Sequence, residues 1–302
     1  MAGLSFLGGI MPSTEIKPAT TFEQQIELLI KRGLIINDKE KAKDFLSRYS
    51  YYSLTGYLHN FKIDLNNNDY IPNLTFEKVF AIIEFDRRFR NILMYTIEII
   101  EHTLKTKFAY NSAHSFGPEG YLEPSNFRNI KEHSIFINKF YESKVNNNNL
   151  PFVKHHINRY EGRMPIWVAV EIFTMGMIYN FYKNMPTQNQ KQIAREFNTG
   201  KQQLLSWIDN IKYVRNLVAH YMRIYNFNLQ KTPMKCENHH KTYIPTHKIF
   251  DIVYIMMFLI LDKNEWNNNI ISNIKALFLQ YEEYIDISCI GFPDNWEDLL
   301  RK

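Results

Sequence analysis

The stretch from Thr75 to about His114 is the feature that most constrains the fold of this chain. Its apolar residues recur every three to four positions over some forty residues, which is the period of an α-helix and not of a strand. The stripe comprises Phe76, Val79, Phe80, Ile83, Leu93, Ile97, Ile100, Leu104 and Phe108. The pattern predicts one long helix, or two helices in line.

Helical periodicity also dominates the remaining sequence, and convincing two-residue alternation is scarce. Thr21 can cap a first helix with Gln24 in a capping box, and Gly33 suits the left-handed residue at its end. A further helix is expected from about Lys39 to Tyr49. Later helices are predicted at about Pro165–Lys183, Lys201–Tyr221, Pro245–Leu261 and Ile270–Tyr284.

These segments predict an all-α protein, built as a helical bundle with mixed crossing angles. The polar break at Asn66–Pro72 is the best candidate boundary. We therefore expect a flexible N-terminus over residues 1–16, a small helical module over 17–72 and a larger helical domain over 73–302.

Charged residues interrupt the apolar stripe of the long helix at Asp86, Arg87 and Arg90. One interpretation is a solvated patch with an Asp86–Arg90 pair at i,i+4 spacing, and the other is the charged wall of a functional cleft. We favour the solvated patch, because charge on long helices is usually exposed to water.

Composition narrows the classes of function. The chain has 36 Lys and Arg against 31 Asp and Glu, so its net charge of +5 permits an anionic partner without demanding one. Two cysteines cannot form a disulfide framework, which favours the reducing cytoplasm. The apolar run at about Ile252–Leu261 is too short to span a membrane, so no membrane association is expected.

The segment Ile211–Asn226 carries the residues with the clearest chemistry. Arg215, Asn216 and His220 lie within one and a half helical turns of each other. Cleavage of RNA by its own 2′-hydroxyl needs a group that moves protons and a cation that offsets charge on the phosphate. Histidine suits the first task and arginine the second, so these three residues are candidates for a catalytic set. The alternative, which the short motif by itself favours, is an arginine in a surface ion pair and a histidine at a helix end.

Helix geometry limits how these three residues can converge. Asn216 and His220 are four residues apart and share a face, so the amide could orient the imidazole. Arg215 and His220 are five apart and point roughly 140° away from each other. Either the helix is irregular near His220, or two copies of the chain meet around one phosphate. A homodimer is the natural solution.

Other cations could contact RNA phosphates, or could equally be ordinary surface charge. These predicted RNA-binding residues are Lys212, Arg223, Arg159 and Arg163. Tyr213 and Tyr221 flank the motif, and we interpret each as packing rather than as a platform for a base.

Cofactor and metal sites have weak support in the sequence. Cys236, His239, His240 and His247 lack the spacing of a tetrahedral zinc site, so we expect a solvated loop there. No phosphate-cradling glycine loop and no acidic two-metal cluster is present in the sequence. We therefore expect neither a metal nor a cofactor.

The run RNLVAHYMRIYN, at Arg215–Asn226, resembles the RN-x-x-AH-x-x-R signature of the AbiD/AbiF abortive-infection family. The segments RYSYYSLTGYLHNFK, IIEFDRRFRNILMYTIEIIEHTLKTKFAY, FGPEGYLEPSNF, PIWVAVEIFTMG and GFPDNW resemble other landmarks of that family, in the same order. One departure is Met222–Arg223–Ile224–Tyr225, where the family more often has Arg-Leu-Trp.

The resemblance implies a helical fold of the HEPN ribonuclease superfamily and metal-independent cleavage that leaves a 2′,3′-cyclic phosphate. Arg215 and His220 carry over directly as the catalytic pair, with Asn216 beside them. It further implies a role in bacterial phage defence, and a structured noncoding RNA as a possible regulatory partner.

Two rival functions stay open. One is a HEPN-like protein that holds a structured RNA without cutting it, and the other is a toxin restrained by an RNA or antitoxin. The complete Arg215, Asn216 and His220 set argues against a pure binder, which would not need all three.

Overall fold

The computed structural model describes residues 18–64, 68–235 and 243–302. Throughout these ranges the regular structure is helical, and only two isolated β-bridges occur, Ile35–Thr75 and Lys62–Tyr70. The prediction of an all-α fold is confirmed. The N-terminus over residues 1–16, expected to be flexible, lies outside the described residues.

The chain divides into two compact units, Met1–Val79 and Phe80–Lys302. The first unit contains α1 (Phe22–Lys31), α2 (Lys39–Arg48) and α3 (Tyr51–Leu58). Thr21 and Gln24 form the predicted capping box at the start of α1, which packs against α2. Gly33 follows α1 with a φ of 93°, the left-handed conformation expected from the sequence.

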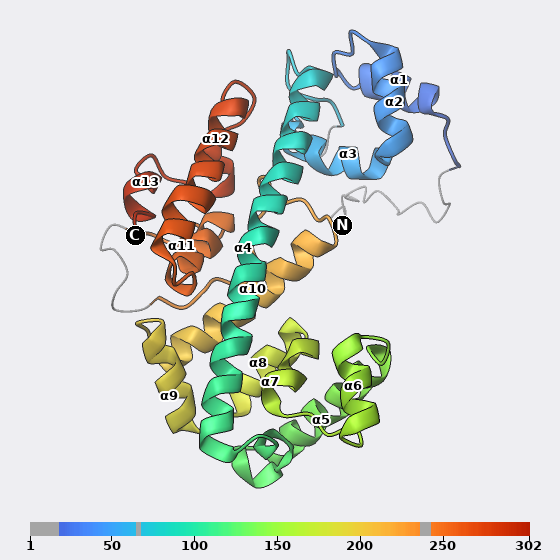
Figure 1. The fold of residues 1–302 in the computed structure, drawn as a ribbon. Coiled ribbons are helices and arrows are strands. Elements are labelled where there is room, and N and C mark those ends of the chain that lie inside the picture. The colour runs from blue at the N-terminus through green and yellow to red at the C-terminus, as the bar shows by residue number, and fades with distance from the viewer. Residues whose placement is uncertain (1–17, 65–67, 236–242) are drawn as a thin grey trace, which may run out of the picture. The chain divides into compact units, whose positions relative to one another are not determined.

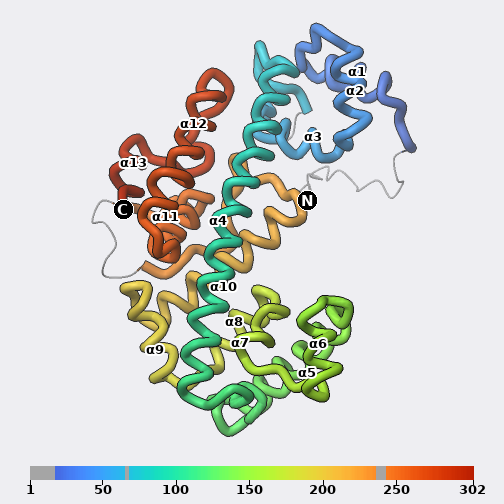
Figure 2. Tube along the Cα trace, in the orientation of Figure 1, coloured from blue at the N-terminus to red at the C-terminus, as the bar shows by residue number. Residues whose placement is uncertain are grey.

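The second unit is built along α4 (Phe76–Phe116), whose first turn belongs to the first unit. This 41-residue helix matches the segment predicted from its apolar period. Figure 2 shows the chain turning back after α4 and continuing into α5. The remaining α-helices are α5 (Ile130–Asn146), α6 (Pro151–Arg159), α7 (Ile166–Ala169), α8 (Met175–Asn184), α9 (Thr187–Glu196), α10 (Lys201–Ala219), α11 (Ile249–Leu259), α12 (Ser272–Tyr281) and α13 (Trp296–Leu299).

The helix α10 occupies the middle of the second unit and packs against α8, α9 and α11 (Figure 1). Its buried face is an apolar stripe with helical spacing: Leu204, Trp207, Ile208, Ile211, Val214 and Val218. Because the stripe supplies the burial that holds the helix in place, residues on the opposite face of α10 are free for other roles.

One predicted helix is broken in the structure. The segment Pro165–Lys183 contains α7, a 3₁₀ turn η4 (Val170–Ile172) and then α8, instead of one helix. Phe173 is extended, and the Thr174 side chain accepts a hydrogen bond from the Met177 amide as the N-cap of α8. The apolar period did not indicate this break, since the segment has buried residues in both helices.

Asp86 and Arg90 are buried, so the solvated patch expected on α4 is wrong. Asp86 is 0% exposed and Arg90 is 7% exposed, and the two side chains form the predicted i,i+4 ion pair inside the protein. A buried charge is tolerated only when it is paired and hydrogen-bonded. The partners that meet this condition belong to the segment after α10.

The helix α11 begins at Ile249, four residues later than predicted. Buried Asp251 accepts hydrogen bonds from the backbone amides of Thr246 and His247, so the chain wraps around this carboxylate before the helix starts. Among the residues that the structure describes, no helix combines the length and apolar character needed to cross a membrane.

Candidate active site

The residues Arg215 and Asn216 lie on the solvent-facing side of α10. Both are exposed, whereas their neighbours Val214 and Val218 are buried. The apolar stripe thus fixes the helix rotation and turns the two polar residues outward. Within the described parts of the chain, neither side chain makes a hydrogen bond or an ion pair.

His220 is the cap residue at the carboxyl end of α10 and is exposed. Tyr221 follows with a φ of 57°, its amide bonds to Val218 O, and the Met222 amide bonds to Leu217 O at 2.9 Å. This is a Schellman ending, in which glycine usually occupies the left-handed position. A tyrosine there is strained, and such strain concentrates at functional sites.

The segment after the helix is fixed by Asp86. Its carboxylate accepts hydrogen bonds from the Tyr225 amide at 2.8 Å and from the Ile224 amide at 3.3 Å. Arg90 pairs with Asp86 and also donates to Met222 O at 3.4 Å. The buried pair therefore holds the chain just beyond His220. The sequence signal for this contact is the presence of charged residues within the apolar stripe of α4, which the pattern alone led us to interpret as a solvated patch.

A pocket of about 530 Å³ opens beside Arg215 and Asn216, and we call it the motif pocket. Four parts of the second unit form its walls: α4, the end of α5, the turn from η4 into α8, and α10. The lining residues are Glu101, Lys105, Ser143, Asn147, Leu150, Glu171, Ile172, Phe173, Thr174, Met175, Gly176, Lys212, Arg215 and Asn216.

Two of the three cations in the motif pocket already have partners. Lys105 pairs with Glu101 at 3.2 Å and donates to Glu171 O, and Lys212 pairs with Asp209 at 2.6 Å. Burial alone would raise the pKa of Asp209, but hydrogen bonds from Lys212 and Lys231 lower it below the usual value. Asp209 therefore stays ionised and keeps Lys212 occupied.

Arg215 is the lining cation without an ion pair among the described residues. The first turn of α8, at Thr174–Gly176, also lines the pocket. Amide groups in the first turn of a helix lack intrahelical acceptors and favour an anion. Within the described residues, the motif pocket thus combines an unpaired guanidinium and a helix start, which favour a phosphate group, with one unpaired carboxylate, Glu171.

Sequence reasoning missed Lys105, Ser143 and Asn147 as lining residues, because they come from helices far from the motif in sequence. The Ser143 hydroxyl donates to Ile172 O at 2.7 Å, and the Asn147 side chain donates back to Ser143 O. These bonds fix the wall opposite α10. No local pattern in the sequence marks them.

His220 does not line the motif pocket. Its amide donates to Asn216 O at 3.0 Å, and no hydrogen bond between the two side chains occurs in the described structure. One chain thus brings Arg215 and Asn216 together and leaves the imidazole on the adjoining surface. This is the divergence expected from helix geometry, where residues five apart face different ways.

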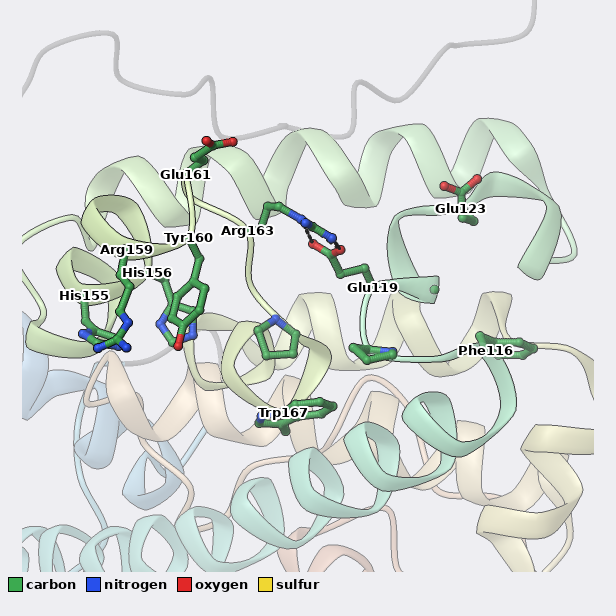
Figure 3. A pocket seen from close by; sticks show the side chains of 13 residues that line it. Phe116, Glu119, Glu123, His155, His156, Arg159, Tyr160, Glu161, Arg163 and Trp167 are labelled. Atoms are coloured by element: carbon green, nitrogen blue, oxygen red, sulfur yellow. Dashed lines mark hydrogen bonds and ion pairs between the residues drawn. The ribbon is translucent and has the colours of Figure 1, made fainter.

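The other predicted RNA-binding residues lie in different places. Lys212 lines the motif pocket, and Arg223 lines neither this pocket nor the next. Arg159 and Arg163 line a separate cavity of about 1050 Å³, which we call the Trp167 cavity (Figure 3). Arg163 is paired there with Glu119, and hydrogen bonds from its guanidinium hold the pKa of Glu119 below the usual value.

Three of the four residues weighed as metal ligands, Cys236, His239 and His240, lie outside the described residues. The fourth, His247, places its Nδ1 atom 2.8 Å from the Thr232 hydroxyl. Among the described residues, no group of three or more histidines, cysteines and carboxylates could hold a metal ion.

Comparison with known proteins gives one match. A family model described as Abi-like protein matches residues 44–226. No curated protein and no solved structure matches the chain. The matched region contains Asp86, the motif pocket, the Trp167 cavity and His220.

Proposed function

The chain belongs to the Abi-like protein family, and on that premise we propose that it is an endoribonuclease that cuts RNA without a metal ion at Arg215, Asn216 and His220. The family indicates a role in abortive infection. We further propose that the chain belongs to the AbiD/AbiF branch and has the HEPN type of fold, as its motif RNLVAHYMRIYN suggests.

The unpaired Arg215 in the motif pocket is the observation that carries this proposal. Lys105 and Lys212 are neutralised by neighbouring acids, so Arg215 supplies the charge that a phosphate would meet. Its planar guanidinium matches two phosphate oxygens at once.

The proposed reaction is an internal transfer within the RNA strand. His220 accepts the proton of the 2′-hydroxyl, and the 2′-oxygen forms a bond to phosphorus as the bond to the 5′-oxygen breaks. The leaving 5′-oxygen takes up a proton, so the products are a 2′,3′-cyclic phosphate and a 5′-hydroxyl. Arg215 stabilises the charge on the other phosphate oxygens, and Asn216 positions the phosphate.

Two copies of the chain complete the site in this proposal. Arg215 and Asn216 line the motif pocket, while His220 lies outside it on the same chain. A second copy related by a two-fold axis can place its His220 over the pocket, since such an interface is reciprocal. Each homodimer then holds two equivalent sites.

The test is cleavage of a defined RNA in excess EDTA, with analysis of the product ends. We expect wild-type protein to leave cyclic phosphates, and His220→Ala to slow cleavage by about 10² to 10⁴. A matched control is His114→Ala, because His114 is another exposed histidine of the second unit and lines neither pocket. Equal cleavage by His220→Ala and wild type would show that the assigned site is wrong. RNA binding without cleavage would instead indicate an RNA-holding protein.

A further inference from the structure

The Trp167 cavity is built within the second unit from the end of α4, the turn that follows it, the end of α6 and the start of α7. We propose that this cavity binds one nucleotide, with its base against the exposed Trp167 ring and its phosphate against Arg159 and the neighbouring histidines. The proposal rests on the proposed function only in naming an RNA strand as one source of that nucleotide.

Exposed aromatic rings are the first sign of a ligand. Trp167 is 53% exposed and Tyr160 is 47% exposed, and both line the cavity. The other three tryptophans, Trp207, Trp266 and Trp296, are at most 6% exposed. A base can stack on either exposed ring regardless of its sequence, because every base has a flat π-face.

Two histidines and an arginine lie beside the Tyr160 ring. The ring centroid lies 5.7 Å from that of His155, 5.2 Å from that of His156 and 6.0 Å from the Arg159 guanidinium carbon. Figure 3 shows His155, His156, Arg159 and Tyr160 grouped at one end of the cavity. In the described part of the chain, neither Arg159 nor His155 forms an ion pair with a carboxylate.

The acids of the cavity are placed away from this cluster. Glu119 is occupied by Arg163, and Figure 3 shows Glu161 pointing away from the cluster and Glu123 at the opposite end of the cavity. An anion is therefore favoured at one end only. Several phosphates along the whole cavity would meet these carboxylates, so a single nucleotide fits the charge pattern.

A rigid turn positions the cluster. Glu161 and Gly162 both adopt the left-handed conformation, with φ values of 55° and 79°, and the Gly162 amide bonds to His156 O. The Lys144 ammonium donates to Gly162 O at 2.5 Å. Left-handed geometry at Glu161 is strained, and such strain is retained where a geometry is needed.

A ligand with both a base and a phosphate explains the residues that line the Trp167 cavity better than a ligand with only one of these groups. An apolar ligand would leave Arg159 and His155 without a partner, and a simple anion would not use the exposed rings. A nucleotide satisfies both. Its base covers Trp167, and its phosphate accepts hydrogen bonds from Arg159 and the neighbouring imidazoles.

The fluorescence of Trp167 tests the proposal directly, because the other three tryptophans are buried. The protein is His220→Ala, which keeps RNA intact, and the probes are AMP, GMP and a 2′-O-methyl decanucleotide. We expect quenching on titration with at least one probe, and no quenching in a Trp167→Phe background. By calorimetry, Trp167→Phe keeps the affinity, whereas Trp167→Leu and Arg159→Gln each weaken it about tenfold.

The probes separate the two sources of the nucleotide. Quenching by the mononucleotides indicates a free effector, and quenching by the decanucleotide alone indicates a segment of RNA held outside the motif pocket. The proposal is overturned if no probe quenches Trp167, or if Trp167→Leu and Arg159→Gln bind every probe as tightly as the parent protein. Because binding is measured without cleavage, failure of the proposed ribonuclease activity does not affect this result.

Discussion

The motif pocket and the Trp167 cavity differ in the side chains they offer. The motif pocket, of about 530 Å³, is lined by charged, polar and aliphatic groups and by the first turn of α8, and Arg215 is its cation without an ion pair among the described residues. The Trp167 cavity, of about 1050 Å³, exposes two large rings beside Arg159 and two histidines. The first suits a reacting phosphate, and the second suits a base that is held.

The comparison shows that the RNA-binding cations predicted from the sequence do not lie in one site. Arg215 and Lys212 belong to the motif pocket, whereas Arg159 and Arg163 belong to the other cavity. The contribution of a cation to the binding of an anionic ligand depends on whether it already has a partner, because a paired arginine gains little from a new anion.

The largest effect is expected from Arg215→Ala, which should slow cleavage and leave nucleotide binding in the Trp167 cavity unchanged. Arg215→Ala removes the unpaired cation of the motif pocket, and loss of one group that stabilises developing charge costs about 10²- to 10³-fold in rate. Quenching of Trp167 by nucleotide should be unchanged in this variant. Cleavage rates and fluorescence titrations on the same preparation measure both, and the separation fails if Arg215→Ala also abolishes quenching.

A large loss of stability is expected from Asp86→Asn. The change breaks a buried ion pair whose carboxylate also holds the segment after His220, and breaking such a pair costs about 3–5 kcal/mol. Urea unfolding followed by tryptophan emission reports the second unit, which contains all four tryptophans. The matched control is Glu297→Gln, which removes an exposed pair with Lys275 and should change stability little. Similar midpoints for the two variants would contradict this account.

Opposite effects on stability and rate are expected from Tyr221→Gly. Glycine relieves the left-handed strain after His220, worth about 1 kcal/mol, so the variant should be more stable than wild type. Tyr221 is 84% exposed beside the proposed catalytic histidine, so loss of its ring should slow cleavage about tenfold if a base stacks there. Tyr221→Ala, which removes the ring without relieving the strain, should lose rate and gain no stability. A more stable Tyr221→Gly protein with full activity would exclude stacking.

The smallest effect is expected from Arg163→Gln. Arg163 is held by Glu119, so its removal should change nucleotide affinity by less than about twofold, in contrast to Arg159→Gln. Calorimetry with the same probe compares the two variants. Equal losses would mean that the Glu119 pair opens to admit the ligand.

Much of the fold and part of the site followed from local sequence. The apolar stripe of α4 and the capping box at Thr21 were predicted, and both occur in the structure. The outward face of Arg215 and Asn216 follows from the stripe on α10, because helix period alone sets which residues face inward. The divergence of Arg215 and His220 followed from the same geometry.

The remainder depends on contacts between segments distant in sequence. Asp86 is buried because the amides of Ile224 and Tyr225 reach it, and 138 and 139 residues separate these partners. Lys105 and Ser143 enter the motif pocket through the packing of α4 and α5 around it. The left-handed Tyr221 carries no glycine or asparagine signal, since tertiary packing overrides the local preference there.

The most direct test of the account mixes two inactive proteins. In the proposed homodimer Arg215 and His220 of one site come from different chains, so Arg215→Ala and His220→Ala subunits should complement each other after subunit exchange. One of the two sites in each mixed dimer is then intact, and random exchange restores about a quarter of wild-type cleavage. Neither variant alone should cut RNA. Failure of the fully exchanged mixture to regain cleavage would contradict a site shared between two copies.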